Sequence, residues 1–193
     1  MSEHNRRSIR LKEYDYSQPG AYFVTICVHG FKNILGSIAN GEVRLNKYGR
    51  VIRDEWLRTM ELRPNVLMDE YVVMPNHFHG IIMIIDDTTV GATRRVAPTT
   101  TTKPTTLKSN AIGSIIGQIK SASTKRIRKM GLEYFRWQRN YYEHVIRNED
   151  KLHKIRQYIH TNPLKWHLDR ENPERVGINK LENEIFQMEI EQK

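Results

Sequence analysis

The feature that most constrains the fold is the run from residue 71 to residue 85, which reads YVVMPNHFHGIIMII. It contains two runs of β-forming side chains separated by Pro75-Asn76, a pair typical of turns. The pattern predicts a β-hairpin whose second strand opens with His-Phe-His. Because successive side chains of a strand alternate between its faces, His77 and His79 point the same way, about 7 Å apart along the strand.

Two interpretations of this histidine pair are open from the motif alone. Two imidazoles on one strand face, beside a turn, are able to bind a single metal ion. Alternatively, His77 and His79 form a partly solvated strand end without a ligand.

Length and composition predict a single domain, over residues 1–193, of ordinary hydrophobic content (38%). The formal net charge of +9 favours a polyanionic partner, most often nucleic acid. The one cysteine, Cys27, excludes an internal disulfide and a cysteine-based zinc cluster. The sequence has neither an apolar run long enough to span a bilayer nor a signal peptide, so we expect a cytoplasmic protein without a membrane partner.

The order of the predicted elements indicates the fold class. Strands are predicted at residues 21–28, 70–74, 78–85 and 135–146, a small hairpin at 31–38 and 43–45, and helices at 46–62, 111–129 and 151–161. Without the inserted hairpin, the order β-α-β-β-α-β-α matches a ferredoxin-like split βαβ fold. We therefore predict an α+β protein with a central antiparallel sheet, an inserted hairpin and a C-terminal helical extension.

Three segments lie outside this predicted core. Residues 1–20 form a basic N-terminal arm, residues 87–110 a flexible Thr/Pro-rich connector, and residues 164–193 the C-terminal extension, with a turn followed by a helix.

Basic residues gather in the arm and at the end of the second predicted helix. They are either solvated charges or a surface that binds nucleic-acid phosphates. The candidates for nucleic-acid binding are Arg6, Arg7, Arg10, Lys120, Lys125, Arg126, Arg128 and Lys129.

The helix at residues 151–161 carries a second possible half of a site. Tyr158 and Asn162 are four residues apart, so they share one helix face, about 6 Å apart. Beside a histidine pair, they suit a nucleophile next to a metal ligand. The alternative is that Tyr158 packs in the core and Asn162 ends the helix before Pro163.

Several motifs together resemble a known family, the single-tyrosine HUH (IS200-like) transposases, in their REP-associated tyrosine transposase branch. The similarity extends from residue 6 to about residue 166. It rests on MPNHFH at residues 74–79, WQRNYYEHVIR at 137–147, IRQYIHTNP at 155–163, and the N-terminal residues 14–17 and 20–25.

The resemblance implies a ferredoxin-like fold and metal-dependent cleavage and rejoining of single-stranded, hairpin-containing DNA through a covalent 5'-phosphotyrosine intermediate. It implies His77 and His79 as metal ligands and Tyr158 as the nucleophile. It also implies Asn162 as a further ligand, where better-known insertion-sequence members carry Gln. The implied cofactor is Mg²⁺ or Mn²⁺, and the partner is DNA, bound by a monomer or a homodimer.

This chemistry suits the residue types. A phosphotyrosine bond stores the energy of the broken phosphodiester, so rejoining needs no ATP. A divalent ion held by imidazole and amide ligands acts as a Lewis acid on the scissile phosphate. Two alternatives are a module that binds single-stranded nucleic acid without cutting it, and a metal-dependent nuclease that uses water and leaves no covalent adduct.

Overall fold

The structure of the chain is a computed structural model, which describes residues 14–85 and 111–187. The basic residues Arg6, Arg7 and Arg10 and the connector at 87–110 lie outside the described residues. Within those ranges the elements, in chain order, are β1 (Gly20–Cys27), η1 (His29–Phe31), β2 (Gly36–Ala39), β3 (Glu42–Leu45), α1 (Lys47–Leu62), β4 (Val66–Val73), β5 (His77–Ile84), α2 (Ile112–Lys129), β6 (Tyr142–Ile146), α3 (Glu149–Thr161), η2 (Pro163–Leu168) and α4 (Lys180–Gln187).

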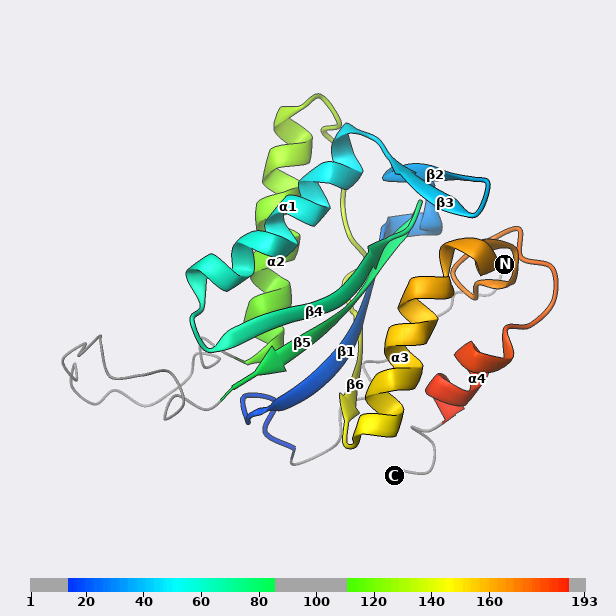
Figure 1. The fold of residues 1–193 in the computed structure, drawn as a ribbon. Coiled ribbons are helices and arrows are strands. Elements are labelled where there is room, and N and C mark those ends of the chain that lie inside the picture. The colour runs from blue at the N-terminus through cyan, green and yellow to red at the C-terminus, as the bar shows by residue number, and fades with distance from the viewer. Residues whose placement is uncertain (1–13, 86–110, 188–193) are drawn as a thin grey trace, which may run out of the picture.

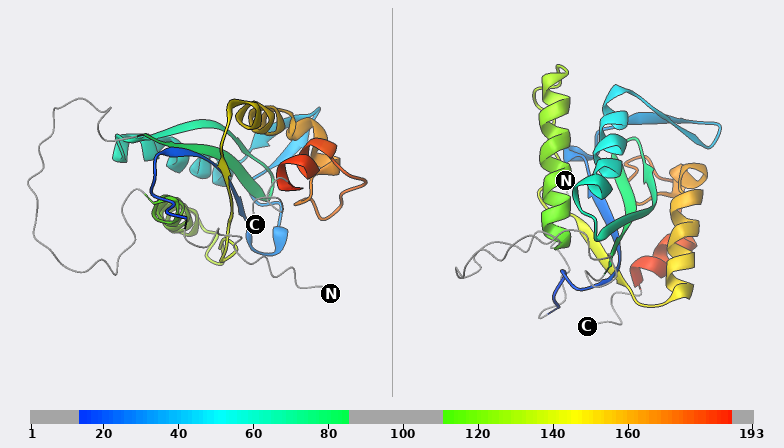
Figure 2. Two further views of the ribbon diagram at one scale, coloured as in Figure 1. Left: turned by 90° about the horizontal axis from the view of Figure 1, so that it is seen from below. Right: turned by 60° about the vertical axis from the view of Figure 1, so that its left-hand side comes forward.

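The main sheet has four strands in the order β4-β5-β1-β6, and each neighbouring pair is antiparallel. Helices α1 and α2 lie on one face of this sheet, whereas α3 and α4 lie on the other (Figures 1 and 2). The strand order and the chain order together make a ferredoxin-like sheet, so the predicted fold class is confirmed. No helix within the described ranges is both long enough and apolar enough to cross a bilayer.

The packing of α1 against β5 decides which way the histidines point. Trp56 of α1 is fully buried, and its ring centroid lies 4.6 Å from that of Phe78. A Cβ added at Gly80 would lie 2.6 Å from the Trp56 ring, so glycine permits this close approach. Because Phe78 and Gly80 face α1, the alternating side chains of His77 and His79 face α3.

Asparagine side chains cap the starts of α1 and α3, and α3 begins two residues before the predicted start at residue 151. The side chain of Asn46 accepts hydrogen bonds from the backbone N–H groups of Tyr48 and Gly49, at 2.8 and 3.1 Å. Asn148 caps α3 in the same way, accepting from Lys151 N at 2.9 Å. These side chains satisfy backbone donors that a helix start leaves unpaired.

The inserted hairpin is shorter than predicted. Strands β2 and β3 form a separate two-stranded sheet joined through Asn40 and Gly41, whose φ angles of 54° and 75° suit a tight hairpin turn. Residues 31–35, which were predicted as strand, are not strand. Their backbone contacts the central turn instead, where Leu35 N donates to Pro75 O at 2.9 Å.

The last strand is also shorter than predicted, because only Tyr142–Ile146 pairs with β1. The preceding segment folds against α2, where Trp137 Nε1 donates to Ser123 Oγ at 3.1 Å. Its backbone touches the end of β1 through a single bridge between Val28 and Trp137. Trp137 is buried, as expected of a core residue, but it belongs to a loop.

Candidate metal centre and tyrosine site

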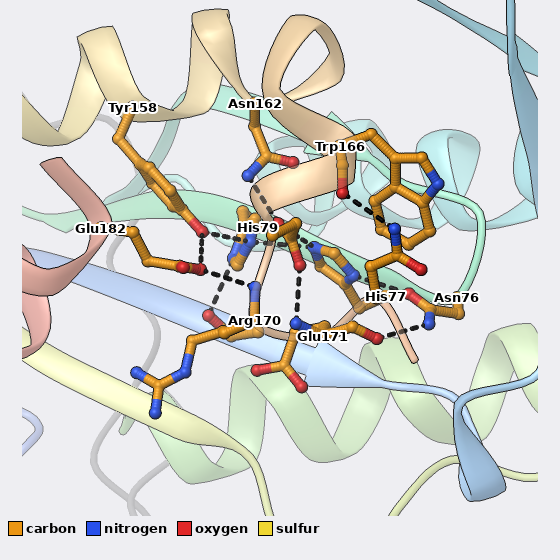
Figure 3. A network of polar contacts seen from close by, with 12 residues as sticks. Asn76, His77, His79, Tyr158, Asn162, Trp166, Arg170, Glu171 and Glu182 are labelled. Atoms are coloured by element: carbon orange, nitrogen blue, oxygen red, sulfur yellow. Dashed lines mark hydrogen bonds and ion pairs between the residues drawn. The ribbon is translucent and has the colours of Figure 1, made fainter. Parts of the chain in front are cut away.

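His77 and His79 meet at the α3 side of β5, and both are fully buried. Their Nε2 atoms lie 2.9 Å apart, although the residues are two positions apart along the strand. Each ring turns its other nitrogen toward a polar side chain. His77 Nδ1 lies 2.8 Å from Asn76 Oδ1, and His79 Nδ1 lies 2.8 Å from Thr25 Oγ1 of β1 (Figure 3).

The contacts of Asn76 determine which His77 nitrogen carries the proton. Asn76 Nδ2 donates to the carbonyls of Phe31 and Glu171, so its Oδ1 is left to accept from His77 Nδ1. A neutral His77 therefore has its lone pair on Nε2, toward His79. Metal-binding histidines are usually oriented by such a hydrogen bond from the nitrogen away from the ion.

Tyr158 reaches the same point from α3. Its hydroxyl lies 3.1 Å from His79 Nε2, and its ring packs edge-on against the His79 ring with centroids 5.2 Å apart. The neighbouring Ile155 and Ile159 are buried core residues in the same cluster as Tyr158. The structure therefore brings the predicted tyrosine to the predicted histidine pair.

Asn162 is fully buried at the end of α3 and does not contact the histidines in any hydrogen bond that the described residues make. Its Nδ2 donates to Asp169 Oδ2 at 2.7 Å. Its Oδ1 is buried and has no hydrogen-bond partner within the described part of the chain. A buried carbonyl oxygen of this kind is costly unless something else binds it.

Asp169 is a site residue that the sequence analysis missed. It is fully buried, its Oδ2 lies 3.7 Å from His77 Nε2, and its Oδ1 accepts from the backbone of Glu171 at 2.7 Å. Ligand atoms of His77, His79 and Asp169 all lie within 4.8 Å of one another. Nothing in the polar stretch around Asp169 marks it as buried, because a charged run before Asn-Pro is typical of a surface turn.

Glu182 of α4 is the second residue missed. The Tyr158 hydroxyl donates to Glu182 Oε1 at 3.0 Å, and the same oxygen accepts from Arg170 N at 3.2 Å (Figure 3). Glu182 and Asp169 both belong to the C-terminal extension, and their carboxylates lie against Tyr158 and His77. The extension thus covers the tyrosine and the histidines, and Tyr158 has no exposed surface.

Burial under the extension raises the pKa values of Tyr158 and Glu182, so that the protonated, neutral forms of both side chains are favoured. Burial raises the pKa of the Tyr158 hydroxyl well above its ordinary value of 10.0, and the charges of Asp169 and Glu182 raise it further. Burial also raises the pKa of Glu182 to about 7, with a further contribution from Asp169. In this arrangement Tyr158 is a phenol that donates its proton, not a phenolate.

The residues present fit a divalent cation. Two imidazole nitrogens and a carboxylate oxygen converge. Asn162 contacts this group through its Nδ2 on Asp169, and its buried Oδ1 has no hydrogen-bond partner among the described residues. The 2.9 Å between the two Nε2 atoms is close to the separation of about 3 Å between adjacent ligands of one six-coordinate ion. Mixed nitrogen and oxygen ligands are compatible with Mn²⁺ and Mg²⁺.

The predicted basic residues of α2 do not join this site, and they divide into three groups. Lys120, Lys125 and Arg128 line an open pocket on the α2 side of the sheet. Arg126 instead pairs with Glu55 at 2.7 Å. Lys129 is exposed near the end of the helix. Their role in binding nucleic acid stays a prediction.

Comparison with known proteins defines the class of fold. A solved structure of a REP-associated tyrosine transposase bound to a REP hairpin matches this chain with a TM-score of 0.54 and 22% identity, covering 86% of this chain and 74% of that chain. The fold is therefore that of the REP-associated, IS200-like tyrosine transposases, and the resemblance in the sequence is confirmed at this level. No protein-family model matches the chain.

The nearer relationship is to a protein without an assigned role. An uncharacterized protein of Haemophilus influenzae is 40% identical to this chain over 167 residues, which cover 86% of this chain and 93% of the relative. The chain belongs to the same family as this Haemophilus protein.

Proposed function

We propose that this protein cleaves and rejoins single strands of DNA, with Tyr158 as the nucleophile and a divalent ion held by His77, His79 and Asp169. The observation that carries the proposal is the 3.1 Å distance between the Tyr158 hydroxyl and His79 Nε2, within a buried group that fits a metal. The fold shared with a transposase bound to a REP hairpin makes hairpin DNA the substrate to test.

In the proposed reaction, the Tyr158 oxygen attacks the scissile phosphorus as the bond from phosphorus to the 3'-oxygen breaks. The products are a 5'-phosphotyrosine and a 3'-hydroxyl, which takes up one proton as the tyrosine loses one. Attack of a 3'-hydroxyl on the phosphotyrosine reverses these changes and rejoins the strand. A bound divalent ion supplies Lewis-acid stabilisation of the charge on the phosphate oxygens.

The chain's own residues have defined parts in this proposal. Thr25 and Asn76 orient the two imidazoles through their outer nitrogens. Asn162 offers its unpartnered Oδ1 as a further ligand and fixes Asp169 through its Nδ2. Helix α4, which carries Glu182, has to shift before a phosphate contacts Tyr158, because the hydroxyl is buried against it.

This burial favours one second candidate function. A protein whose tyrosine is enclosed and protonated suits a module that binds single-stranded DNA without cutting it, in which Tyr158 and Glu182 only stabilise the packing of α3 against α4. The two functions differ in whether a covalent protein–DNA adduct forms.

The test is incubation with Mn²⁺ and a labelled hairpin oligonucleotide pool with single-stranded flanks, followed by a denaturing gel. We expect a shifted protein–DNA band for the wild type that is absent for Tyr158→Phe. Tyr134→Phe, at an exposed tyrosine, is the matched control and should keep the band. Cleavage that survives Tyr158→Phe would instead indicate a nuclease that uses water, and binding without any cleavage would indicate the binding module.

A further inference from the structure

An open pocket of about 590 Å³ lies between the second half of α2 and the segment at residues 137–139. Its lining includes the side chains of Lys120, Lys125, Arg128 and Arg139, with Trp137. It is separate from the tyrosine site, because α2 packs on the opposite face of the sheet from α3 (Figure 1).

Lys120 fixes the shape of this pocket. Its Nζ donates to the backbone carbonyls of Gln138 and Arg139, at 2.6 and 2.9 Å, and so ties the loop to the helix. Trp137 is held from the other side by its hydrogen bond to Ser123. The two walls are thus connected by side-chain contacts before any ligand arrives.

The pocket carries positive charge that the described residues do not neutralise locally. Lys125 and Arg139 are exposed, and no carboxylate is among the described residues that line the pocket. Arg128 uses its Nε to donate to Phe135 O at 3.0 Å. On the neighbouring face of the same helix, by contrast, Arg126 is paired with Glu55 and Asp54. Within the described part of the chain, Lys125 and Arg139 are therefore available to an external anion.

The other lining groups suit a phosphodiester chain. Ser121 adds a hydroxyl group beside the cations, whereas the Thr124 hydroxyl donates to Lys120 O at 2.6 Å. The buried Trp137 is the aromatic residue of the lining. Grooves that bind single-stranded nucleic acid combine cations along the backbone with aromatic side chains. Charged donors make the stronger hydrogen bonds to phosphate oxygens.

The pocket is connected to the strand end that carries the histidines. Gln138 N donates to Cys27 O at 2.8 Å, and Cys27 is paired with His77 across β1 and β5. A nucleic-acid strand that binds in the pocket therefore lies against a loop anchored to the end of the sheet where the site begins.

We propose that this pocket binds backbone phosphates of a DNA strand outside the segment that enters the tyrosine site. The inference rests on the proposed function only in taking DNA as the partner. It assigns Lys125, Arg128 and Arg139 to phosphate contacts and Lys120 to positioning the loop.

The test measures binding of a labelled hairpin oligonucleotide with single-stranded flanks, in EDTA, over a series of salt concentrations. The variant is Lys125→Ala with Arg139→Ala, two exposed side chains. We expect its Kd to rise roughly tenfold near physiological salt, and the slope of log K against log salt to fall by about 1.4, or 0.7 for each lost contact.

The matched control is Arg53→Ala with Lys154→Ala, which removes the same two residue types from exposed ion pairs with Asp54 and Glu184. Its slope should stay near that of the wild type. Equal losses in both double variants, or no loss in either, would overturn the inference. Lys125→Arg with Arg139→Lys keeps both charges and should restore binding, which separates lost charge from misfolding.

A parallel assay for the covalent adduct in Mn²⁺, at saturating DNA, separates the two proposals. If the wild type forms no adduct but the pocket variant still loses binding, the proposed chemistry fails and the pocket assignment stands. If adducts form normally while the pocket variant binds like the control, the pocket assignment fails and the chemistry stands.

Discussion

The hydroxyl of Tyr158 donates a 3.0 Å hydrogen bond to Oε1 of Glu182, so that α4 holds the proton of the residue proposed as the nucleophile. Ile185, one turn further along α4, is fully buried in the same cluster as Phe23 and Tyr158. The contact therefore couples the protonation of the tyrosine to the docking of the last described helix.

Glu182→Gln should make stability less dependent on pH. The pKa of Glu182 is about 7 in the folded protein and 4.5 as its ordinary value, so the folded state binds the proton more tightly. The carboxylate thus costs stability as pH rises from 4.5 to 7, by on the order of 3 kcal/mol. Urea unfolding in EDTA, at pH 4 to 8, measures this effect. The free energy of unfolding of the variant should rise relative to that of the wild type between pH 4.5 and 7.

The glutamine keeps the oxygen that accepts from Tyr158 and Arg170, since both bonds use Oε1. Glu184→Gln is the control, because it removes an exposed carboxylate from the same helix. We expect its difference from the wild type to stay within about 0.5 kcal/mol at every pH. A Glu182→Gln curve parallel to that of the wild type would contradict this account.

Ile185→Ala should loosen α4 and open the tyrosine site. Removing a fully buried isoleucine side chain typically costs about 2–5 kcal/mol, here concentrated in the contact between α4 and the rest of the protein. If the proposed chemistry is right, the covalent adduct should form several-fold faster in Mn²⁺, because a phosphate reaches Tyr158 more often. Rates of adduct formation at saturating hairpin DNA measure this.

Ile116→Ala provides the comparison, since Ile116 is equally buried but packs on the opposite face of the sheet. It should lose similar stability without any gain in rate. Equal or slower adduct formation by Ile185→Ala, relative to Ile116→Ala, would count against a cover formed by α4.

Asp169→Asn should weaken Mn²⁺ binding at least tenfold in the protein without DNA. It removes the only negative charge of the group formed with His77 and His79, and ligand charge contributes strongly to affinity for hard cations. Isothermal titration calorimetry with MnCl₂ measures the effect. Asp69→Asn, at a carboxylate paired with Arg156, is the control and should bind Mn²⁺ like the wild type.

Two helical glycines should respond to alanine in opposite directions. A Cβ at Gly49 would lie 2.1 Å from the Leu35 carbonyl oxygen, a backbone atom, so Gly49→Ala should destabilise by about 1–3 kcal/mol. A Cβ at Gly117 would meet nothing within 4 Å, so Gly117→Ala should stabilise by about 0.5–1 kcal/mol through helix propensity. Thermal or urea unfolding distinguishes them, and stabilisation by Gly49→Ala would contradict the close approach of the Leu35 carbonyl to the start of α1.

Local signals determined most of the fold. Asn46 and Asn148 cap helices that begin within two residues of their predicted starts, because capping depends on a side chain and the next few backbone N–H groups. His77 and His79 lie on one face of β5, as predicted, because side-chain alternation along a strand is also a local property. Residues 135–141 were wrongly predicted as strand. Their β-forming sequence reflects contact with α2, as Trp137 makes with Ser123, and not pairing with another strand.

The sequence by itself placed the two histidines on one strand face, because strand alternation is local geometry. It pointed to Tyr158 as the nucleophile only through the resemblance to the tyrosine transposases. Only the tertiary structure brought in Asp169, from a stretch whose sequence is typical of an exposed turn, and Glu182, from helix α4 of the C-terminal extension. Their burial depends on how the chain after α3 folds back over the sheet. No short sequence pattern predicts how this segment folds back. Long-range packing therefore decided that a carboxylate joins the histidines, that Tyr158 is protonated and that the candidate site is buried.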